Sequence, residues 1–100
     1  MTNKLGVIIL CRYDSKRLYG KALKIINNRP ILEWIYLFVS KCKKIDKICI
    51  ATSDEKSDDI IEDFCDKKNI SCYRGSKNDV AIRFLNCAKQ YNCDYAIRIN

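Results

Sequence analysis

The chain has 100 residues, of which 48% are hydrophobic and 31% are charged, and its formal net charge at pH 7 is +7. This composition is typical of a globular domain and excludes a disordered or collagen-like chain. No apolar run approaches the roughly 18 residues that a membrane-spanning helix needs, so we expect no membrane partner.

Four short segments that are rich in apolar and β-branched residues predict β-strands. The first is a continuous apolar run, and its length suits a strand that is buried on both faces of a parallel sheet. The predicted strands are residues 5–11, 47–52, 70–73 and 94–99.

Three segments between these strands have apolar residues at helical spacing. The first helix is expected to follow a turn at residues 27–30, to begin at Pro30 and to bury Trp34 and Phe38. Ser57 is expected to cap the second helix, and Asn78 or Asp79 the third. The expected helices span about residues 30–44, 58–68 and 80–91.

This alternation of strands and helices predicts the fold class α/β. We expect a Rossmann-like three-layer α/β/α arrangement with a mainly parallel sheet and right-handed crossovers. Residues 94–99 read as a central strand with nothing after it, so we expect the sequence to be truncated after the fourth strand.

The chain has seven cysteines and no histidine. No Cys-x-x-Cys pair occurs, and without histidine the usual zinc ligand sets are missing. We therefore interpret the cysteines as reduced, buried small hydrophobes, which indicates a cytoplasmic location.

The positive charge is concentrated near the N-terminus. Seven basic residues and one acidic residue precede Pro30, which leaves +6 for that stretch and +1 for the remainder. Most of these charges lie in the loop of residues 12–21, directly after the first strand. Ligands of open α/β sheets bind beyond the carboxyl ends of the strands. The loop's cations, Ser15 and Gly20 could wrap a polyphosphate there.

Two common phosphate-binding motifs do not fit this loop. The Walker A pattern needs Ser or Thr after Gly-Lys, whereas Ala22 follows Gly20-Lys21, and Ser15 stands at the place of the first glycine. The dinucleotide pattern G-x-G-x-x-G is also absent, since Gly6 is alone on its strand.

The loop instead resembles the signature of the sugar-acid cytidylyltransferases, which include the CMP-sialic acid and CMP-Kdo synthetases. That signature is Arg-x-x-Ser-x-Arg-Leu-Pro-Gly-Lys, and residues 12–21 match it apart from the proline. The chain is most similar to the type found in spore coat polysaccharide biosynthesis. It shares with that type the Arg-Gly-Ser loop at residues 74–76, Asp79-Val80, Arg83-Phe84 and a similar second loop at residues 51–54.

The resemblance implies roles for particular residues. Arg12 and Lys21 would be the catalytic residues, which contact the CTP phosphates and stabilise charge on the departing pyrophosphate. Leu10 and Cys11 would present backbone groups to the cytosine ring. Ser76 would either contact the nucleotide or cap the helix that follows it. The implied nucleotide-binding residues are Leu10, Cys11, Arg12, Ser15, Arg17, Lys21, Arg74, Gly75 and Ser76.

Two departures from the family pattern stand out. Tyr19 replaces the proline of the signature. The family's Gly-Asp pair, whose aspartate helps to hold Mg²⁺, would follow Asn100, so we expect a Mg²⁺ cofactor but no metal ligand within this chain. Residues 1–100 would then be the N-terminal, nucleotide-binding part of a single cytidylyltransferase domain, inactive on their own.

The implied reaction transfers CMP from CTP to a sugar or sugar acid, releases pyrophosphate and serves the synthesis of surface polysaccharides. The expected partners are CTP and the sugar, with a homodimer for the full-length protein and no nucleic acid. Two alternatives stay open: a nucleic-acid-binding module, which the basic loop and a pI near 9.1 would support, and a nucleotide-binding fragment without catalysis.

Overall fold

A computed structural model of the chain describes residues 3–14 and 20–100. It contains one four-stranded sheet, in which every neighbouring pair of strands is parallel, and one small hairpin. The strands of the main sheet are β1 (Leu5–Leu10), β4 (Lys47–Ser53), β5 (Ser71–Gly75) and β6 (Tyr95–Ile99), in the spatial order β5-β4-β1-β6. The hairpin pairs β2 (Ile25–Ile26) with β3 (Arg29–Pro30).

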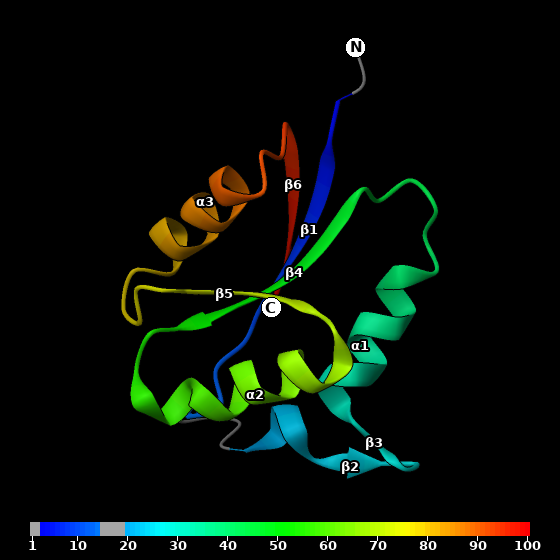
Figure 1. Cartoon of the computed structure of the whole chain (residues 1–100), viewed down its shortest axis with the longest axis vertical. Coiled ribbons are helices and arrows are strands. Elements are labelled where there is room, and N and C mark those ends of the chain that lie inside the picture. The colour runs from blue at the N-terminus through cyan, green and yellow to red at the C-terminus, as the bar shows by residue number, and fades with distance from the viewer. Residues whose placement is uncertain (1–2, 15–19) are drawn as a thin grey trace.

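Three α-helices cover the two faces of the main sheet (Figure 1). They are α1 (Ile31–Ser40), α2 (Asp59–Lys68) and α3 (Val80–Gln90), and short 3-10 turns occupy Lys21–Leu23 and Lys56–Asp58. The α/β class and the three-layer parallel arrangement are thus confirmed.

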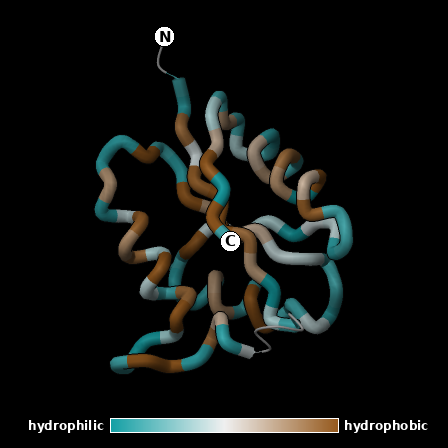
Figure 2. The backbone as a smooth tube through the Cα atoms, turned by 180° about the vertical axis from the view of Figure 1, so that it is seen from behind, coloured by the Kyte–Doolittle hydropathy of each residue, from teal (hydrophilic) through white to brown (hydrophobic). Residues whose placement is uncertain are grey.

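The side-chain alternation along β1 explains the three layers. Ile9 packs with Leu32 of α1 and Ile61 of α2 in one core cluster. Ile8 and Leu10 point the other way and pack with Cys87 of α3. Figure 2 shows brown, hydrophobic colour along these inner strands. Because both faces are covered, a continuous apolar run is required in β1.

Within the described residues β6 pairs with β1 alone and lies at one side of the four-stranded sheet, and its central place in a longer chain stays a prediction. The expected cap of α2 is wrong. Ser57 does not cap α2, because the chain enters that helix through a 3-10 turn and Asp58 holds the N-cap position. Asp79 does cap α3, where its carboxylate accepts a hydrogen bond from the Ile82 amide at 3.0 Å.

The first helix also differs from its prediction. The turn at Asn27 and Asn28 connects β2 and β3, and both asparagines have positive φ, 50° and 71°, as a tight hairpin turn requires. Helix α1 ends at Ser40, and the two aromatic residues that were expected to be buried are not: Trp34 is 41% exposed and Phe38 is 77% exposed. Trp34 instead donates a hydrogen bond from Nε1 to the carbonyl of Ile26 at 2.7 Å, which ties the hairpin to α1.

The longest helix of the described residues, α3, has 11 residues, and none of the described helices could cross a membrane.

Candidate nucleotide-binding site

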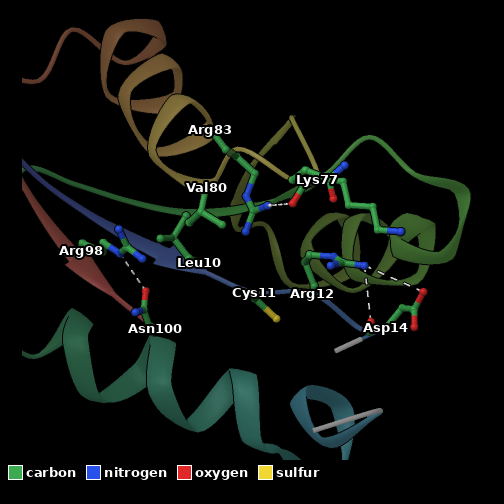
Figure 3. Close-up of a pocket in the computed structure, with 10 residues that line it drawn as sticks. Leu10, Cys11, Arg12, Asp14, Lys77, Val80, Arg83, Arg98 and Asn100 are labelled. Atoms are coloured by element: carbon green, nitrogen blue, oxygen red, sulfur yellow. Dashed lines mark hydrogen bonds and ion pairs between the residues drawn. The ribbon is translucent and has the colours of Figure 1, made fainter. Parts of the chain in front are cut away.

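A cavity of about 740 Å³ opens at the carboxyl end of β1, between the N-terminal end of α3 and the end of β6 (Figure 3). Parallel strands bring their carboxyl ends to one edge of the sheet, so segments far apart in the sequence meet there. The lining residues are Leu10, Cys11, Arg12, Asp14, Lys77, Asn78, Val80, Arg83, Arg98 and Asn100.

The charge of this cavity is strongly positive. Of the described residues that line it, four are cations, namely Arg12, Lys77, Arg83 and Arg98, and one, Asp14, has a side-chain carboxylate. Asp14 lies 3.9 Å from Arg12 and forms an ion pair with it. Arg98 donates from Nε to the side-chain oxygen of Asn100 at 3.0 Å. Such a surface attracts an anionic ligand.

Arg12 is held by a carboxylate that is completely buried. Asp58, at the start of α2, is 0% exposed and lies 3.4 Å from Nε of Arg12. The same carboxylate accepts a hydrogen bond from the Tyr13 amide at 2.7 Å and a further one from the Ser53 hydroxyl at the end of β4. Asp58 therefore joins three elements directly beneath the first residues of the basic loop.

These contacts keep Asp58 ionised. Burial by itself would raise the pKa of this carboxyl group. The hydrogen bonds from Ser53 and from the Tyr13 amide, together with the charge of Arg12, outweigh burial and lower the pKa below its ordinary value. The loop thus leaves β1 over a fixed negative charge that orients Arg12.

The Cys11 thiol at the cavity wall is not activated. Burial raises the pKa of Cys11 to about 12, and the charge of Asp58 adds to this effect. The reactive form of cysteine is the thiolate, so this thiol is not a nucleophile at neutral pH. The Cys11 amide donates to the Ala51 carbonyl at 3.1 Å, which continues the pairing of β1 with β4.

Lys21 lies in a second, more apolar hollow of about 370 Å³ on the α1 side of β1. Leu10, Cys11, Arg12 and Asn100 line both hollows, so the two adjoin along the end of β1. The structure thus brings Leu10, Cys11, Arg12 and Lys21 to one region. Ser15 and Arg17, the other predicted loop ligands, lie outside the described residues.

The Arg-Gly-Ser segment lines a separate hollow beside the cavity. Arg74 and Gly75 belong to strand β5 rather than to its exit loop. The Arg74 guanidinium is already occupied: it pairs with Asp59 at 2.7 Å and with Glu62 at 3.0 Å. It also donates to the carbonyls of Ser53 and Glu55.

Ser76 performs a local role at the start of α3. Its hydroxyl accepts a hydrogen bond from the Asp79 amide at 3.0 Å, which is the helix-cap function that was its alternative. Lys77 and Asn78 line both this hollow and the main cavity. The nucleotide contacts of Arg74, Gly75 and Ser76 stay predictions.

Sequence reasoning missed several residues of the cavity. Asp58 carries no motif signal, because its role depends on Ser53 and Tyr13, which only the fold brings beside it. Arg83 was visible only as part of the Arg-Phe pair, and its burial at 3% exposure depends on the packing of α3. Arg98 belongs to no motif of the sequence, and the fold places it at the cavity.

The part of the chain that the structure describes holds no group of three or more carboxylate, thiol or imidazole side chains that could bind a metal ion. The cavity contributes one carboxylate, Asp14, and Arg12 already pairs with it. This donor set does not fit a Mg²⁺ site, which needs oxygen ligands in octahedral geometry.

The fold and the cavity together define a class: α/β proteins with a basic cavity at the carboxyl ends of a parallel sheet. A sequence profile described as "Cytidylyltransferase" matches residues 6–100, almost the whole chain. The chain therefore belongs to the cytidylyltransferase family.

Individual relatives agree with this assignment. The chain is 33% identical to the spore coat polysaccharide biosynthesis protein SpsF of Bacillus subtilis, over 97% of this chain and 42% of that protein. It is 38% identical to 3-deoxy-manno-octulosonate cytidylyltransferase 2 of Hydrogenovibrio crunogenus, over 61% of this chain and 25% of that protein.

A solved cytidylyltransferase of Leptospira borgpetersenii superposes with a TM-score of 0.91 at 33% identity, and the match covers 98% of this chain and 41% of that one. The chain thus spans well under half the length of these relatives. The family resemblance to sugar-acid and spore coat cytidylyltransferases is confirmed.

Proposed function

We propose that this chain is the CTP-binding part of an enzyme that transfers CMP to a sugar or sugar acid and releases pyrophosphate. The observation that carries this proposal is the cluster of arginines around the cavity at the end of β1, within the fold of a cytidylyltransferase. Residues 1–100 would form the N-terminal part of a single domain, and the acceptor sugar would bind mainly to segments outside this sequence.

The chemistry needs alignment and positive charge. A hydroxyl oxygen of the sugar forms a bond to the α-phosphorus of CTP, the bond to the β-phosphate oxygen breaks, and the hydroxyl proton is lost to solvent or a base. Negative charge grows on the departing pyrophosphate. Arg12 and Lys21, from the two adjoining hollows, would stabilise that charge, and Ser15 and Arg17 of the same loop would add donors.

The base would be recognised by backbone groups. Leu10 ends β1 and Cys11 follows it at the junction of the two hollows, a position that supports contact with cytosine. Arg74 can take part only if it exchanges some of its present partners for the nucleotide. We therefore expect Gly75 and Ser76 to contribute mainly through the shape of their loop.

Magnesium is the cofactor expected from the family. Because the described carboxylates do not fit such a site, the aspartate that would hold the metal is proposed to lie outside residues 1–100. A cytoplasmic location and a homodimer of the longer protein belong to the same proposal.

Isothermal titration of the chain with CTP and ATP tests the proposed function. We expect CTP to bind at least about tenfold more tightly than ATP, because a base-specific contact is worth roughly 1–2 kcal/mol. Lys21→Met should weaken CTP binding, whereas Lys89→Met, an exposed lysine of α3, should not. Equal or tighter binding of ATP would contradict a cytidylyl function.

A further inference from the structure

Arg83 is the most deeply buried cation of the cavity. It projects from α3, is 3% exposed, and in Figure 3 points toward the cavity floor between Arg12 and Arg98. Over residues 3–14 and 20–100 it forms no ion pair with any carboxylate, and its Nε has no hydrogen-bond partner. A buried charge without a counter-ion is unfavourable unless a ligand supplies the opposite charge.

The partners that Arg83 does have are neutral. Its Nη1 donates to the carbonyl of Ser76 at 3.0 Å and reaches the carbonyl of Lys77 at 3.4 Å. These bonds fix the guanidinium beneath the loop that leads into α3. They satisfy one nitrogen and leave the net charge of the group uncompensated.

The neighbours of Arg83 make the need for an anion greater. Burial is the main cause that lowers the pKa of Arg83, and the positive charges of Arg12 and Arg98 lower it further. The charge of Asp58 acts in the opposite direction without cancelling these effects. A buried arginine whose charged form is disfavoured by two neighbouring arginines is typical of a site prepared for an oxyanion.

We propose that Arg83 is an anion-binding residue whose guanidinium, together with Arg12 and Arg98, binds an oxyanion group of the substrate. This inference deepens the proposed function, on which it rests for the identity of the substrates. The oxyanion is a phosphate group of the nucleotide or the carboxylate of a sugar acid, since both offer oxygens that suit a guanidinium. The anion would thus be bound by a residue of α3 in addition to the residues of the loop 12–21.

The competing role for Arg83 is a structural one, in which it only ties the Ser76–Lys77 loop to α3. The two roles predict opposite effects on stability. Removing a structural arginine lowers the stability of the fold. Removing a buried charge that has no counter-ion relieves an unfavourable free energy, and this gain equals or exceeds the loss of the two hydrogen bonds. Stability and ligand binding should therefore separate in an Arg83 variant.

The test measures the binding of tripolyphosphate, of a hexuronate and of uncharged cytidine by calorimetry and by thermal shift. Arg83→Met should keep the melting temperature of the chain within a few degrees and weaken the binding of tripolyphosphate or of the hexuronate at least about tenfold. Cytidine binding should not change. Lys89→Met removes the same charge from an exposed site on the same helix and should bind both anions normally.

The pattern of losses identifies the source of the oxyanion. A loss confined to tripolyphosphate assigns Arg83 to the phosphates, and a loss confined to the hexuronate assigns it to the acceptor. Arg83→Lys keeps a positive charge but loses the planar guanidinium that can donate two parallel hydrogen bonds, and it is expected to restore part of the binding. It serves as the second variant if Arg83→Met fails to fold.

Failure of this inference is distinguishable from failure of the proposed function. If the Arg83 variants bind both anions normally while CTP still binds better than ATP, the inference is overturned and the proposed function stands. If ATP binds as well as CTP but tripolyphosphate binding depends on Arg83, the inference stands and the cytidylyl function falls.

Discussion

Two arginines on either side of the loop after β5 have contrasting surroundings. Arg74 lies between two carboxylates, Asp59 and Glu62, and two backbone carbonyls accept its remaining hydrogen bonds. Arg83 is more deeply buried, and within residues 3–14 and 20–100 its hydrogen-bond partners are the carbonyls of Ser76 and Lys77. A side chain whose charge is balanced within the protein holds the fold together, whereas one whose charge is not balanced is available to a ligand.

The pKa shifts of the two groups run in opposite directions. Burial would lower the pKa of Arg74, but the hydrogen bonds and charges of Asp59 and Glu62 raise it instead. Burial and the neighbouring arginines lower the pKa of Arg83. The Arg-Gly-Ser segment predicted a nucleotide contact for Arg74. The arginine whose charge is not balanced by a described carboxylate is Arg83, on the helix that follows.

The largest effect is expected where the cavity depends on Asp58. Asp58→Ala should lower the free energy of unfolding by about 3 kcal/mol, because it leaves the Ser53 hydroxyl, the Tyr13 amide and Arg12 without their common partner. Urea denaturation measures this loss. Asp63→Ala, at an exposed position of the same helix, should change stability by no more than about 0.5 kcal/mol. Equal effects of the two variants would contradict the role assigned to Asp58.

A smaller loss of stability is expected at Arg74. Arg74→Met should cost roughly 1.5 kcal/mol, since its carboxylate partners are partly exposed and the two carbonyls lose a charged donor. The same denaturation experiment should show a smaller cost for Arg83→Met, although Arg83 is the more buried residue. The contrast between the two arginines breaks down if Arg83→Met is the more destabilising of the pair.

The smallest expected effect is the dependence of the chain's stability on pH, which Asp58 beneath the cavity would cause. The pKa of Asp58 lies below its ordinary value of 3.8 in the folded chain. The stability it contributes is therefore fully present above pH 3.8 and is lost as the pH falls below that value through the folded-state pKa. Asp58→Asn should flatten the acid limb of a stability–pH curve measured by urea denaturation. An unchanged acid limb in this variant would show that another group causes the acid loss.

Much of this fold could be predicted because local patterns carry it. The apolar run of β1, the helical spacing of α2 and α3 and the cap at Asp79 depend on neighbouring residues, and each appears where expected. The turn at Asn27 and Asn28 was predicted but the hairpin around it was not, since asparagines with positive φ also occur in turns that join no strands. Trp34 has helical spacing yet packs toward the hairpin, because α1 presents a different face to the sheet from the one we assumed.

The sequence alone determined the class of the protein: strand-helix alternation and a basic signature of defined spacing identify a cytidylyltransferase. Only the tertiary structure decided which charges balance each other. Asp58, Ser53 and Tyr13 meet because parallel strands bring distant segments to one edge of the sheet. At the same edge Arg83 has no ion pair with any described carboxylate. Charge balance depends on distance and burial, and neither is visible from residue order.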